Sequence, residues 1–283
     1  MKSGFAVLVG RSNVGKSTLL NALVGSKVAI VTPKPQTTRR PVRGILHDPR
    51  GQIVFVDTPG IFLGKKDTLS KKLNELVREQ LEGIELIVYV MDPTRPVGEE
   101  EETIQRLLRK LPIPILAVIN KSDLPKEKLI SLADMRRADV GQRATFEISA
   151  QKRRDLNRLV DAMFALLPEG VPYYPDMQLT DMGHREWLEE IIREKAFLRL
   201  QKELPYSVAV QVEDVALRDG VRVIAAKVWT TDERYKRMII GSRGSMLRQI
   251  GTDARREIEG ATGDRVYLEL IVKVDPKWPE RFA

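Results

Sequence analysis

Short apolar runs alternate with amphipathic stretches over the first part of the chain. The runs are continuous and rich in β-branched residues, and they predict strands at Phe5–Val9, Ile53–Val56, Leu86–Met91, Ile115–Ile119 and Thr145–Ile148. Helical spacing between them predicts helices at Lys16–Val24, Leu69–Leu81, Glu99–Leu111, Leu129–Arg137 and Asp155–Leu167. Strand–helix alternation with strands apolar on both faces predicts an α/β fold with a mostly parallel sheet.

The pattern changes at the proline-rich stretch Pro168–Pro175, which ends the preceding helix and favours an extended linker. Thr180 or Asp181 is the expected N-cap of a charged amphipathic helix over 183–201. Alternating residues then predict strands at Ser207–Val212 and Val221–Thr230, joined by an Asp-Gly turn.

A glycine-containing turn at Gly241–Gly244 separates two further predicted helices, and the strand Arg265–Val274 follows. The second part therefore has the order α-β-β-α-α-β. We expect a first domain over 1–168, a linker over 169–182 and a second domain over 183–283.

Charge and composition narrow the classes of function. The 283 residues carry a net charge of +8, which suits nucleic acid or an anionic membrane surface as well as a merely basic enzyme. The absence of cysteine excludes disulfides, thiol nucleophiles and cysteine metal sites, and two histidines are too few for a histidine-rich site. No apolar run approaches the roughly 20 residues of a membrane span, and the N-terminus does not resemble a signal or transit peptide.

A phosphate-binding motif follows the first predicted strand. Gly10–Ser17 matches G-x-x-x-x-G-K-[ST] and opens a predicted helix, as the mechanism of this motif requires. Glycines let backbone N–H groups turn toward an anion, and the helix N-terminus adds its positive dipole. Lys16 would reach the β and γ phosphates, and the Ser17 hydroxyl would bind Mg²⁺.

The fourth predicted strand is followed by Asn120-Lys121-Ser122-Asp123, which selects guanine over adenine. A carboxylate at Asp123 accepts from both N1–H and the exocyclic amine of guanine, whereas adenine offers the wrong donors. Ser149-Ala150, after the last strand, would lend backbone donors to the guanine O6. Ligands bind at this carboxyl edge of open α/β sheets.

Two further segments are expected to respond to the γ phosphate. In Asp57-Thr58-Pro59-Gly60, Asp57 would hold Mg²⁺ through water and the Gly60 N–H would contact the γ phosphate. Within Gln36–Arg40, Thr38 is favoured over Thr37 as the residue that caps Mg²⁺ only in the triphosphate state. Ile61 occupies the place where many GTPases carry a water-orienting glutamine, so slow intrinsic hydrolysis is expected.

The nucleotide site predicted from these motifs has a catalytic group and a larger binding group. The catalytic residues are Lys16, Thr38, Asp57 and Gly60. The GTP-binding residues are Gly10, Arg11, Ser12, Asn13, Val14, Gly15, Lys16, Ser17, Thr18, Asp57, Thr58, Pro59, Gly60, Ile61, Asn120, Lys121, Ser122, Asp123, Ser149 and Ala150.

The second part carries G-x-x-G between two predicted helices, the signature of a KH module that clamps about four single-stranded nucleotides. Ile239, Ile240, Leu247 and Ile250 are expected to support bases at the groove. The predicted RNA-binding residues are Arg234, Lys236, Arg237, Ile240, Gly241, Ser242, Arg243, Gly244 and Arg248.

With both modules placed, the chain resembles the Era family of bacterial GTPases over nearly its whole length. The resemblance rests on the phosphate motif with Asn13, Gln36–Arg39, Asp57–Ile61, Asn120–Asp123, the linker Pro172–Pro175 and the G-x-x-G. It implies a P-loop NTPase domain of the small-GTPase type, followed by an α+β type II KH domain.

The resemblance also implies a function. Era-family proteins hydrolyse GTP slowly, bind the 3′ end of small-subunit (16S) ribosomal RNA and assist assembly of the 30S subunit. It implies a cytoplasmic, monomeric protein with weak association at the inner face of the cytoplasmic membrane. Ser17 and Thr38 would bind Mg²⁺, and Asn13 matches a position that helps bind K⁺ in related GTPases.

Three alternatives remain open from sequence. The protein could be a constitutive RNA-binding scaffold in which the guanine nucleotide is structural. It could be a P-loop ATPase or kinase, against which Asn120–Asp123 argues. Membrane recruitment through basic residues is a further alternative, although no strongly cationic amphipathic helix with aromatic anchors stands out.

Overall fold

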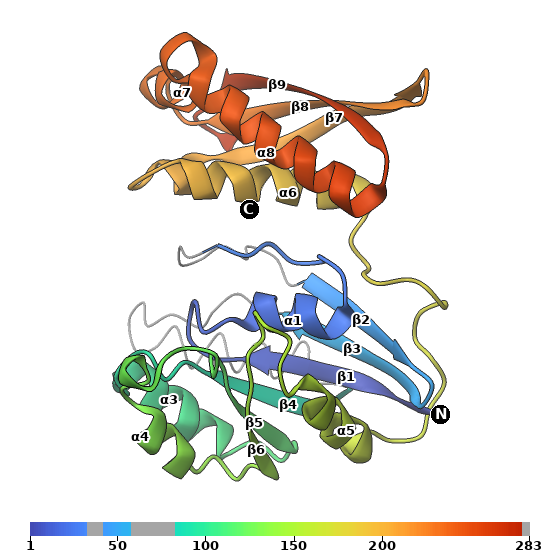
Figure 1. Ribbon diagram of the computed structural model, residues 1–283, viewed down its shortest axis with the longest axis vertical. Helices are drawn as coiled ribbons and strands as arrows, with labels where there is room; N and C mark the ends of the chain where they lie inside the picture. The colour runs from blue at the N-terminus through green and yellow to red at the C-terminus, as the bar shows by residue number, and fades with distance from the viewer. Residues whose placement is uncertain (33–41, 58–82, 279–283) are drawn as a thin grey trace. The chain divides into compact units, whose positions relative to one another are not determined.

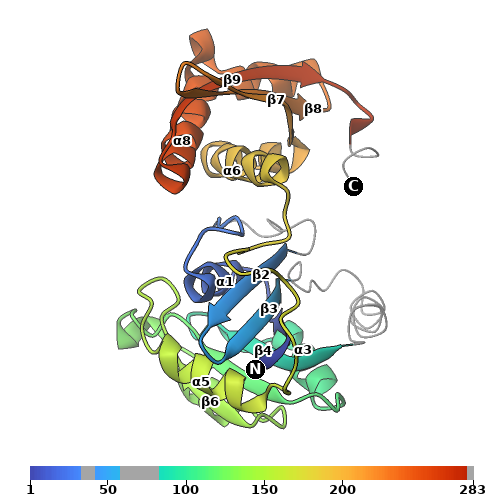
Figure 2. The ribbon, with the colours of Figure 1, turned by 90° about the vertical axis from the view of Figure 1, so that its right-hand side faces the viewer.

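The computed structural model describes residues 1–32, 42–57 and 83–278, and these form two compact units (Figures 1 and 2). The first contains residues 1–29, 42–57 and 83–181 of the described chain, and the second contains 30–32 and 182–278. The helix predicted at Leu69–Leu81 and the segment Gln36–Arg40 lie outside the described residues.

The first unit is built on a six-stranded sheet with the order β2-β3-β1-β4-β5-β6. Its strands are β1 (Lys2–Val9), β2 (Val42–Asp48), β3 (Gly51–Asp57), β4 (Ile84–Met91), β5 (Ile115–Ile119) and β6 (Ala144–Glu147). All neighbours pair in parallel except β2, which is antiparallel to β3. The mostly parallel sheet is confirmed, and the carboxyl ends of its parallel strands share one edge.

Helices of the first unit pack on this sheet. They are α1 (Lys16–Val24), α3 (Glu99–Leu108), α4 (Leu132–Arg137) and α5 (Leu156–Leu166). The prediction of one helix from Leu129 was wrong in its start, because a 3-10 turn at Lys126–Lys128 precedes α4. α1 contacts β2 and β3, while α5 contacts β4.

Strand β2 was not predicted, because its Arg43, His47 and Asp48 interrupt the apolar run. Such composition suits an edge strand, which needs only one buried face. Its Ile45 N–H donates to the carbonyl of Leu179 at 2.9 Å. The stretch after Pro168 is thus hydrogen-bonded to the first unit at its far end.

A second attachment of this stretch lies at Gln52. The Gln52 Oε1 accepts from the N–H groups of Tyr173 at 2.8 Å and Tyr174 at 3.0 Å. Thr180 Oγ1 donates to the Arg43 carbonyl at 2.7 Å. The predicted cap at Thr180 or Asp181 was therefore wrong, and Gly183 is the N-cap, with its N–H donating to Glu186.

The second unit has the predicted order α-β-β-α-α-β. Its elements are α6 (His184–Arg199), β7 (Ala209–Arg218), β8 (Val221–Thr230), α7 (Glu233–Ile240), α8 (Ser245–Thr262) and β9 (Arg265–Val274). β8 lies between β7, its antiparallel neighbour, and β9, its parallel neighbour. The predicted turn joins β7 to β8 with positive φ at Asp219 (49°) and Gly220 (74°), as a tight hairpin requires.

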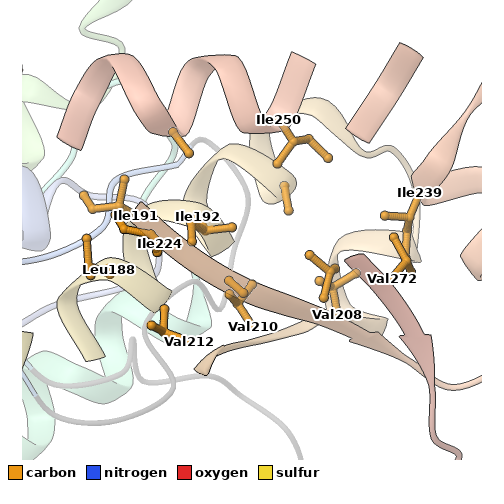
Figure 3. Packing of buried hydrophobic residues seen from close by; sticks show 14 of the residues in the cluster. Leu188, Ile191, Ile192, Val208, Val210, Val212, Ile224, Ile239, Ile250 and Val272 are labelled. Atoms are coloured by element: carbon orange, nitrogen blue, oxygen red, sulfur yellow. The ribbon is translucent and has the colours of Figure 1, made fainter. Parts of the chain in front are cut away.

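One apolar cluster holds the second unit together, and Figure 3 shows side chains from α6, α7, α8 and the three strands meeting in it. Leu188, Ile192, Ile224 and Ile250 are fully buried there. Each such side chain contributes about 1.5–3 kcal/mol relative to exposure. In the part of the chain that the structure describes, no helix is long and apolar enough to cross a bilayer.

Candidate functional site

The predicted phosphate loop lies between β1 and α1, where the chain leaves the carboxyl edge of the sheet. Gly10 has φ 154° and Gly15 has φ 100°. A Cβ at Gly10 would lie 2.3 Å from the Val90 carbonyl oxygen, and one at Gly15 would lie 2.3 Å from Asn120 Nδ2. Both glycines are therefore required by close packing as well as by backbone conformation.

Lys16 and Asp57 place opposite charges in the buried interior of this loop. The Lys16 ammonium donates to the carbonyls of Gly10 at 3.0 Å and Arg11 at 2.8 Å. Burial lowers the pKa of Lys16, and attraction to Asp57 opposes that shift. Burial raises the pKa of Asp57, opposed by Lys16 and by the hydrogen bond from Ser17. Phosphate oxygens would favour the charged form of Lys16.

Ser17 and Asp57 fit a hard divalent cation. The Ser17 hydroxyl donates to Asp57 Oδ2 at 2.5 Å, so a hydroxyl and a carboxylate oxygen are adjacent. The other carboxylate oxygen, Asp57 Oδ1, is buried with no hydrogen-bond partner among the described residues. Oxygen ligands of this kind suit Mg²⁺, which usually keeps several waters and shares its shell with substrate phosphates.

The predicted guanine loop is tied directly to the phosphate loop. Asn120 Nδ2 donates to the Val14 carbonyl at 2.9 Å, and Asn120 Oδ1 accepts from the Ala150 N–H at 3.0 Å. Ser149 Oγ donates to Asp123 Oδ1 at 2.5 Å. The structure thus brings together the phosphate loop, Asn120–Asp123 and Ser149-Ala150, as the sequence predicted.

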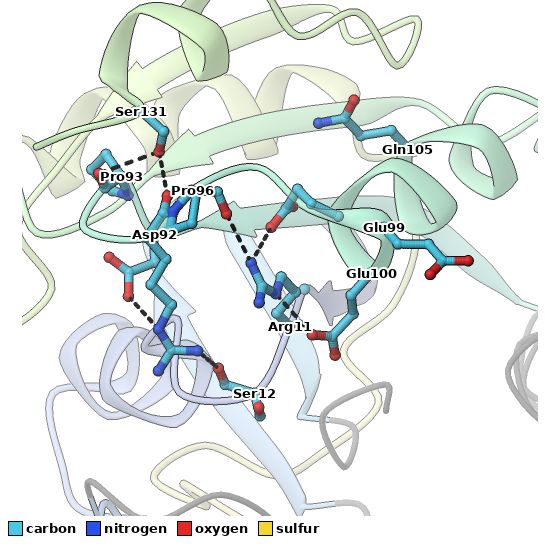
Figure 4. A network of polar contacts seen from close by, with 12 residues as sticks. Arg11, Ser12, Asp92, Pro93, Pro96, Glu99, Glu100, Gln105 and Ser131 are labelled. Atoms are coloured by element: carbon cyan, nitrogen blue, oxygen red, sulfur yellow. Dashed lines mark hydrogen bonds and ion pairs between the residues drawn. The ribbon is translucent and has the colours of Figure 1, made fainter. Parts of the chain in front are cut away.

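A polar network between the phosphate loop and the start of α3 was not predicted (Figure 4). Arg11 Nε donates to Glu100 Oε2 at 2.9 Å, and Arg11 Nη1 donates to the Pro96 carbonyl at 3.3 Å. Glu101, next to Glu100 on α3, is buried and accepts from the Tyr89 hydroxyl. This network fixes the phosphate loop to the start of α3.

Asp92 anchors the other side of the same loop. It is buried directly after β4, and it forms ion pairs with Lys121 and, at 3.7 Å, with Arg95. Arg95 Nη1 in turn donates to the Ser12 carbonyl at 3.2 Å (Figure 4). Asp92 could have been selected from sequence as a site residue, because it is an acidic residue directly after a buried strand, at the carboxyl edge of the sheet where ligands bind. Its partner Lys121 is 29 positions away in sequence, so sequence reasoning missed that ion pair.

Several predicted nucleotide-site residues lie outside the described residues. They are Thr38, Thr58, Pro59, Gly60 and Ile61. Of the remaining residues, Asn13 has φ 62°, and its carbonyl accepts from Lys121 Nζ at 3.4 Å. Thr18 lies in the first turn of α1.

The glycine turn of the second unit joins α7 to α8 through a short 3-10 segment, Ser242–Gly244. Gly241, Arg243 and Gly244 have φ of 73°, 49° and 76°. A Cβ at Gly241 would lie 2.8 Å from Met246 Cβ, whereas one at Gly244 would meet nothing within 4 Å. Space for an added atom at Gly244 means that a ligand backbone can approach there closely.

A groove of about 440 Å³ begins at this turn and runs between α8 and the edge strand β9. Gly244 and Arg248, which were predicted to bind RNA, and Leu247, which was predicted to lie at the groove, line it beside residues that sequence reasoning did not select. These are Gly251, Thr252, Arg255, Tyr267, Leu268 and Leu270. Helical spacing from Arg248 through Gly251 to Arg255 was the signal that could have found the α8 members.

Other predicted nucleic-acid residues lie outside the lining of this groove. Arg234, Arg237, Ser242 and Arg243 are exposed near the turn, and Lys236 pairs with Glu233 at 3.3 Å. The prediction that Ile239 and Ile250 support bases was wrong, since both are fully buried in the apolar cluster. Ile240 is half-buried against the same cluster.

Comparison with known protein families matches the two units separately. Residues 5–121 match a family described as 50S ribosome-binding GTPase, and residues 203–279 match the KH domain family. The α/β GTPase fold followed by a KH fold is thereby confirmed.

Whole-chain comparisons give matches along nearly the full length. GTPase Era of Trichlorobacter lovleyi is 42% identical over 285 residues, covering 100% of this chain and 95% of the relative. GTPase Era of Halothermothrix orenii is 40% identical, covering 99% and 95%. Two solved Era structures cover 99% of this chain and 96% of theirs at 39% identity. One, in complex with MgGDPNP and nucleotides 1506–1542 of 16S ribosomal RNA, has a TM-score of 0.87. The other, an Aquifex aeolicus Era variant bound to GDP and AlF4⁻, has a TM-score of 0.86.

These similarities extend over both units and include the loops whose geometry is described above. The chain therefore belongs to the GTPase Era family and is a GTPase with a C-terminal KH domain.

Proposed function

We propose that this GTPase is an RNA-binding switch that binds small-subunit ribosomal RNA near its 3′ end and assists assembly of the 30S subunit. The observation that carries the proposal is the presence, in one chain, of a joined guanine and phosphate site and of a KH groove open to solvent. A relative at 39% identity was solved with both a guanine nucleotide and 16S RNA.

The nucleotide site is assigned to the residues predicted from the motifs. Gly10–Thr18 would hold the phosphates, Asn120–Asp123 the base, and Ser149-Ala150 the guanine O6. The bond from Asn120 to the Val14 carbonyl supports this assignment, because it holds the base loop against the phosphate loop. Thr58–Ile61 and Thr38 would complete the site around the γ phosphate.

Mg²⁺ fits the oxygens of Ser17 and Asp57, with Thr38 as a further ligand in the triphosphate state. The ion would supply positive charge to the β and γ phosphate oxygens. Lys16 would add a second positive charge, and the Gly60 N–H would contact the γ phosphate. Ile61 cannot donate to or accept from a water, so hydrolysis by the isolated protein would be slow. Asn13 is the proposed K⁺ ligand.

The RNA site is assigned to the glycine turn and the adjoining groove. Arg248 and Arg255 are seven residues apart on α8, about 10 Å along the helix axis, and both line the groove. Two cations at that spacing would contact separate phosphates of one strand. Arg234, Lys236, Arg237 and Arg243 would add charge around the turn.

Gly251 supports a ligand in this groove. A glycine inside a helix costs about 1 kcal/mol relative to alanine. Packing does not require it, since a Cβ there would lie 3.4 Å from Leu270 Cδ1, an ordinary contact. Its effect is to keep the groove open between Arg248 and Arg255, where a base could lie against the helix.

The proposed domain boundaries separate the nucleotide site from the RNA site. We assign 1–168 to the GTPase domain, 169–182 to the linker and 183–283 to the KH domain. The protein would act as a cytoplasmic monomer. Association with an anionic membrane surface stays a prediction from charge and resemblance.

The RNA assignment is tested with variants on one helix. Arg248→Ala and Arg255→Ala are each expected to weaken binding of a single-stranded 3′-end oligonucleotide about tenfold and to lower the salt dependence by about one phosphate contact. Arg256→Ala is the matched control, because Arg256 is exposed on α8 but does not line the groove. Equal affinities for all three variants would reject the groove as the RNA site.

A further inference from the structure

A dense group of positive side chains follows the guanine loop of the first unit. Lys152, Arg153, Arg154 and Arg158, which we call the basic turn, are four cations within seven residues, accompanied by one acid, Asp155. All four are exposed. In the described parts of the chain, none of the four forms an ion pair with a carboxylate. Neither the nucleotide site nor the KH groove uses them.

The backbone of the basic turn is held in a defined conformation. The N–H of Arg154 donates to the Ser149 carbonyl at 3.0 Å, and the reverse bond closes the turn at 3.3 Å. Arg153 and Asp155 have φ of 52° and 59°, a left-handed conformation that surrounding structure must hold. Arg153 Nη2 also donates to the Ala22 carbonyl at the end of α1, at 3.0 Å. The backbone of the basic turn is therefore held in place, while its charged side chains extend into solvent.

The same turn is joined to the guanine loop through one side chain. Ser149 Oγ accepts from the Lys152 N–H at 3.0 Å and donates to Asp123 Oδ1 at 2.5 Å. Asp123 is the carboxylate assigned to the base. Two consecutive hydrogen bonds thus separate the backbone of the basic turn from the group that selects guanine.

The chemistry of the basic turn suits a repeating polyanion. Four flexible cations on an exposed surface match successive phosphates and offer no pocket for a base or a small ligand. The proposed function brings one such polyanion, ribosomal RNA, to this chain. An RNA longer than the KH groove has phosphates available for a second surface.

We propose that the basic turn is a second RNA-contacting surface, on the GTPase unit, that binds sugar–phosphate backbone and slows release of guanine nucleotide. The contact is independent of base sequence. It stabilises the Ser149 turn, and through Ser149 it stabilises the carboxylate that holds guanine. If RNA thereby raises the affinity for nucleotide by some factor, linkage requires that bound nucleotide raise the affinity for RNA by the same factor. This inference rests on the proposed RNA-binding function.

The test compares two RNAs and two triple variants of the full chain. The variant Lys152→Ala/Arg154→Ala/Arg158→Ala removes three charges and keeps Arg153, which bonds to α1. The control Lys110→Ala/Lys128→Ala/Arg137→Ala removes three exposed charges elsewhere on the first unit. The short RNA is a hexanucleotide from the 3′ end, and the long RNA spans the nucleotides 1506–1542 present in the relative's structure.

The basic-turn variant is expected to bind the short RNA normally and the long RNA about 10- to 100-fold more weakly, with the salt slope reduced by about two to three. The control should resemble the parent with both RNAs. Long RNA should slow GDP release from the parent several-fold and leave release from the basic-turn variant unchanged.

Equal affinity of both triple variants for the long RNA would overturn the inference, as would equal slowing of GDP release. A variant that loses the short RNA as well would also overturn it, because the basic turn would then not be a separate surface. If the parent binds neither RNA, the proposed function fails and this inference fails with it. If the parent binds both and only the long-RNA effects are missing, the inference alone fails.

Discussion

Asn120 joins the base-binding and phosphate-binding loops, because its Nδ2 donates to the Val14 carbonyl at 2.9 Å. Its Oδ1 simultaneously accepts from the Ala150 N–H at 3.0 Å. The buried side-chain amide of Asn120 therefore links three loops, which follow strands β1, β5 and β6. These hydrogen bonds link the positions of the phosphate loop, the base loop and the Ser149-Ala150 loop to one another.

Asp123→Asn is expected to lower affinity for GDP by about 100-fold or more, since an amide cannot accept from both guanine donors. The variant should bind xanthosine diphosphate better than the parent does, because xanthine offers an oxygen where guanine has its amine. The Asn oxygen can still accept from Ser149, so the loop should stay folded. Titration calorimetry measures the affinities of parent and variant for both nucleotides. If the variant still prefers GDP as strongly as the parent does, a residue other than Asp123 must recognise the guanine base.

Because of Glu101, the free energy of unfolding should decrease as the pH rises through the range in which its carboxyl group loses its proton. Burial raises the pKa of Glu101 above its ordinary value of 4.5, opposed by the hydrogen bond from Tyr89. Between 4.5 and the raised pKa, the folded state binds more protons than the unfolded state, so the free energy of unfolding decreases with increasing pH. Glu101→Gln should remove that decrease.

The measurement is urea denaturation of parent and Glu101→Gln at several pH values above 4.5. The difference in unfolding free energy isolates Glu101, because other titrating carboxylates, such as Glu147 with its lowered pKa, are common to both. A difference that does not vary with pH would mean that Glu101 is charged in the folded state at its ordinary pKa.

Gly241 and Gly244 share a positive φ but differ in the space around them. Gly244, with ψ 12°, is left-handed, and alanine there should cost about 1 kcal/mol. Gly241, with ψ 175°, lies in a region that is essentially confined to glycine, so its backbone cost should be at least as large. Gly241→Ala should cost about 1–3 kcal/mol more, since its Cβ would lie 2.8 Å from Met246 Cβ. Chemical denaturation of both variants checks the difference, and equal losses would show that the backbone at Met246 gives way easily.

Gly251→Ala should change stability and RNA affinity in opposite directions. The substitution removes a helix-interior glycine without a clash, so it should stabilise the KH unit by about 0.5–1 kcal/mol. The added methyl group would narrow the groove between Arg248 and Arg255, so RNA affinity should fall several-fold. Unchanged RNA affinity in the stabilised variant would mean that no base lies against Gly251.

Much of the architecture could be predicted from sequence because strand–helix alternation and the order of motifs constrain a parallel sheet strongly. Strand Arg265–Val274 was predicted with its observed bounds. The edge strand Val42–Asp48 was not, since one buried face gives a weak pattern. In the site, contiguous loops were found, whereas the Arg11–Glu100 contact joins residues 89 positions apart and leaves no local signal.

The buried face of the KH helices shows a second reason why site residues could not all be predicted from sequence. Ile239 and Ile250 flank the glycine turn in sequence, and proximity suggested that they support RNA bases. Their helical phase turns them into the apolar cluster, while Leu247 and Arg248 face the groove. Periodicity over α8 identifies the two faces, but which face is covered depends on α6 and β9, which both pack against α8.

The most direct test of the switch is the affinity of the full chain for the long 3′-end RNA with a GTP analogue and with GDP, at one fixed salt concentration. The account predicts binding about tenfold or more tighter with the GTP analogue, which corresponds to a coupling free energy of about 1.4 kcal/mol. Equal affinity in the two states would contradict the switch and favour a constitutive RNA-binding scaffold with a structural nucleotide.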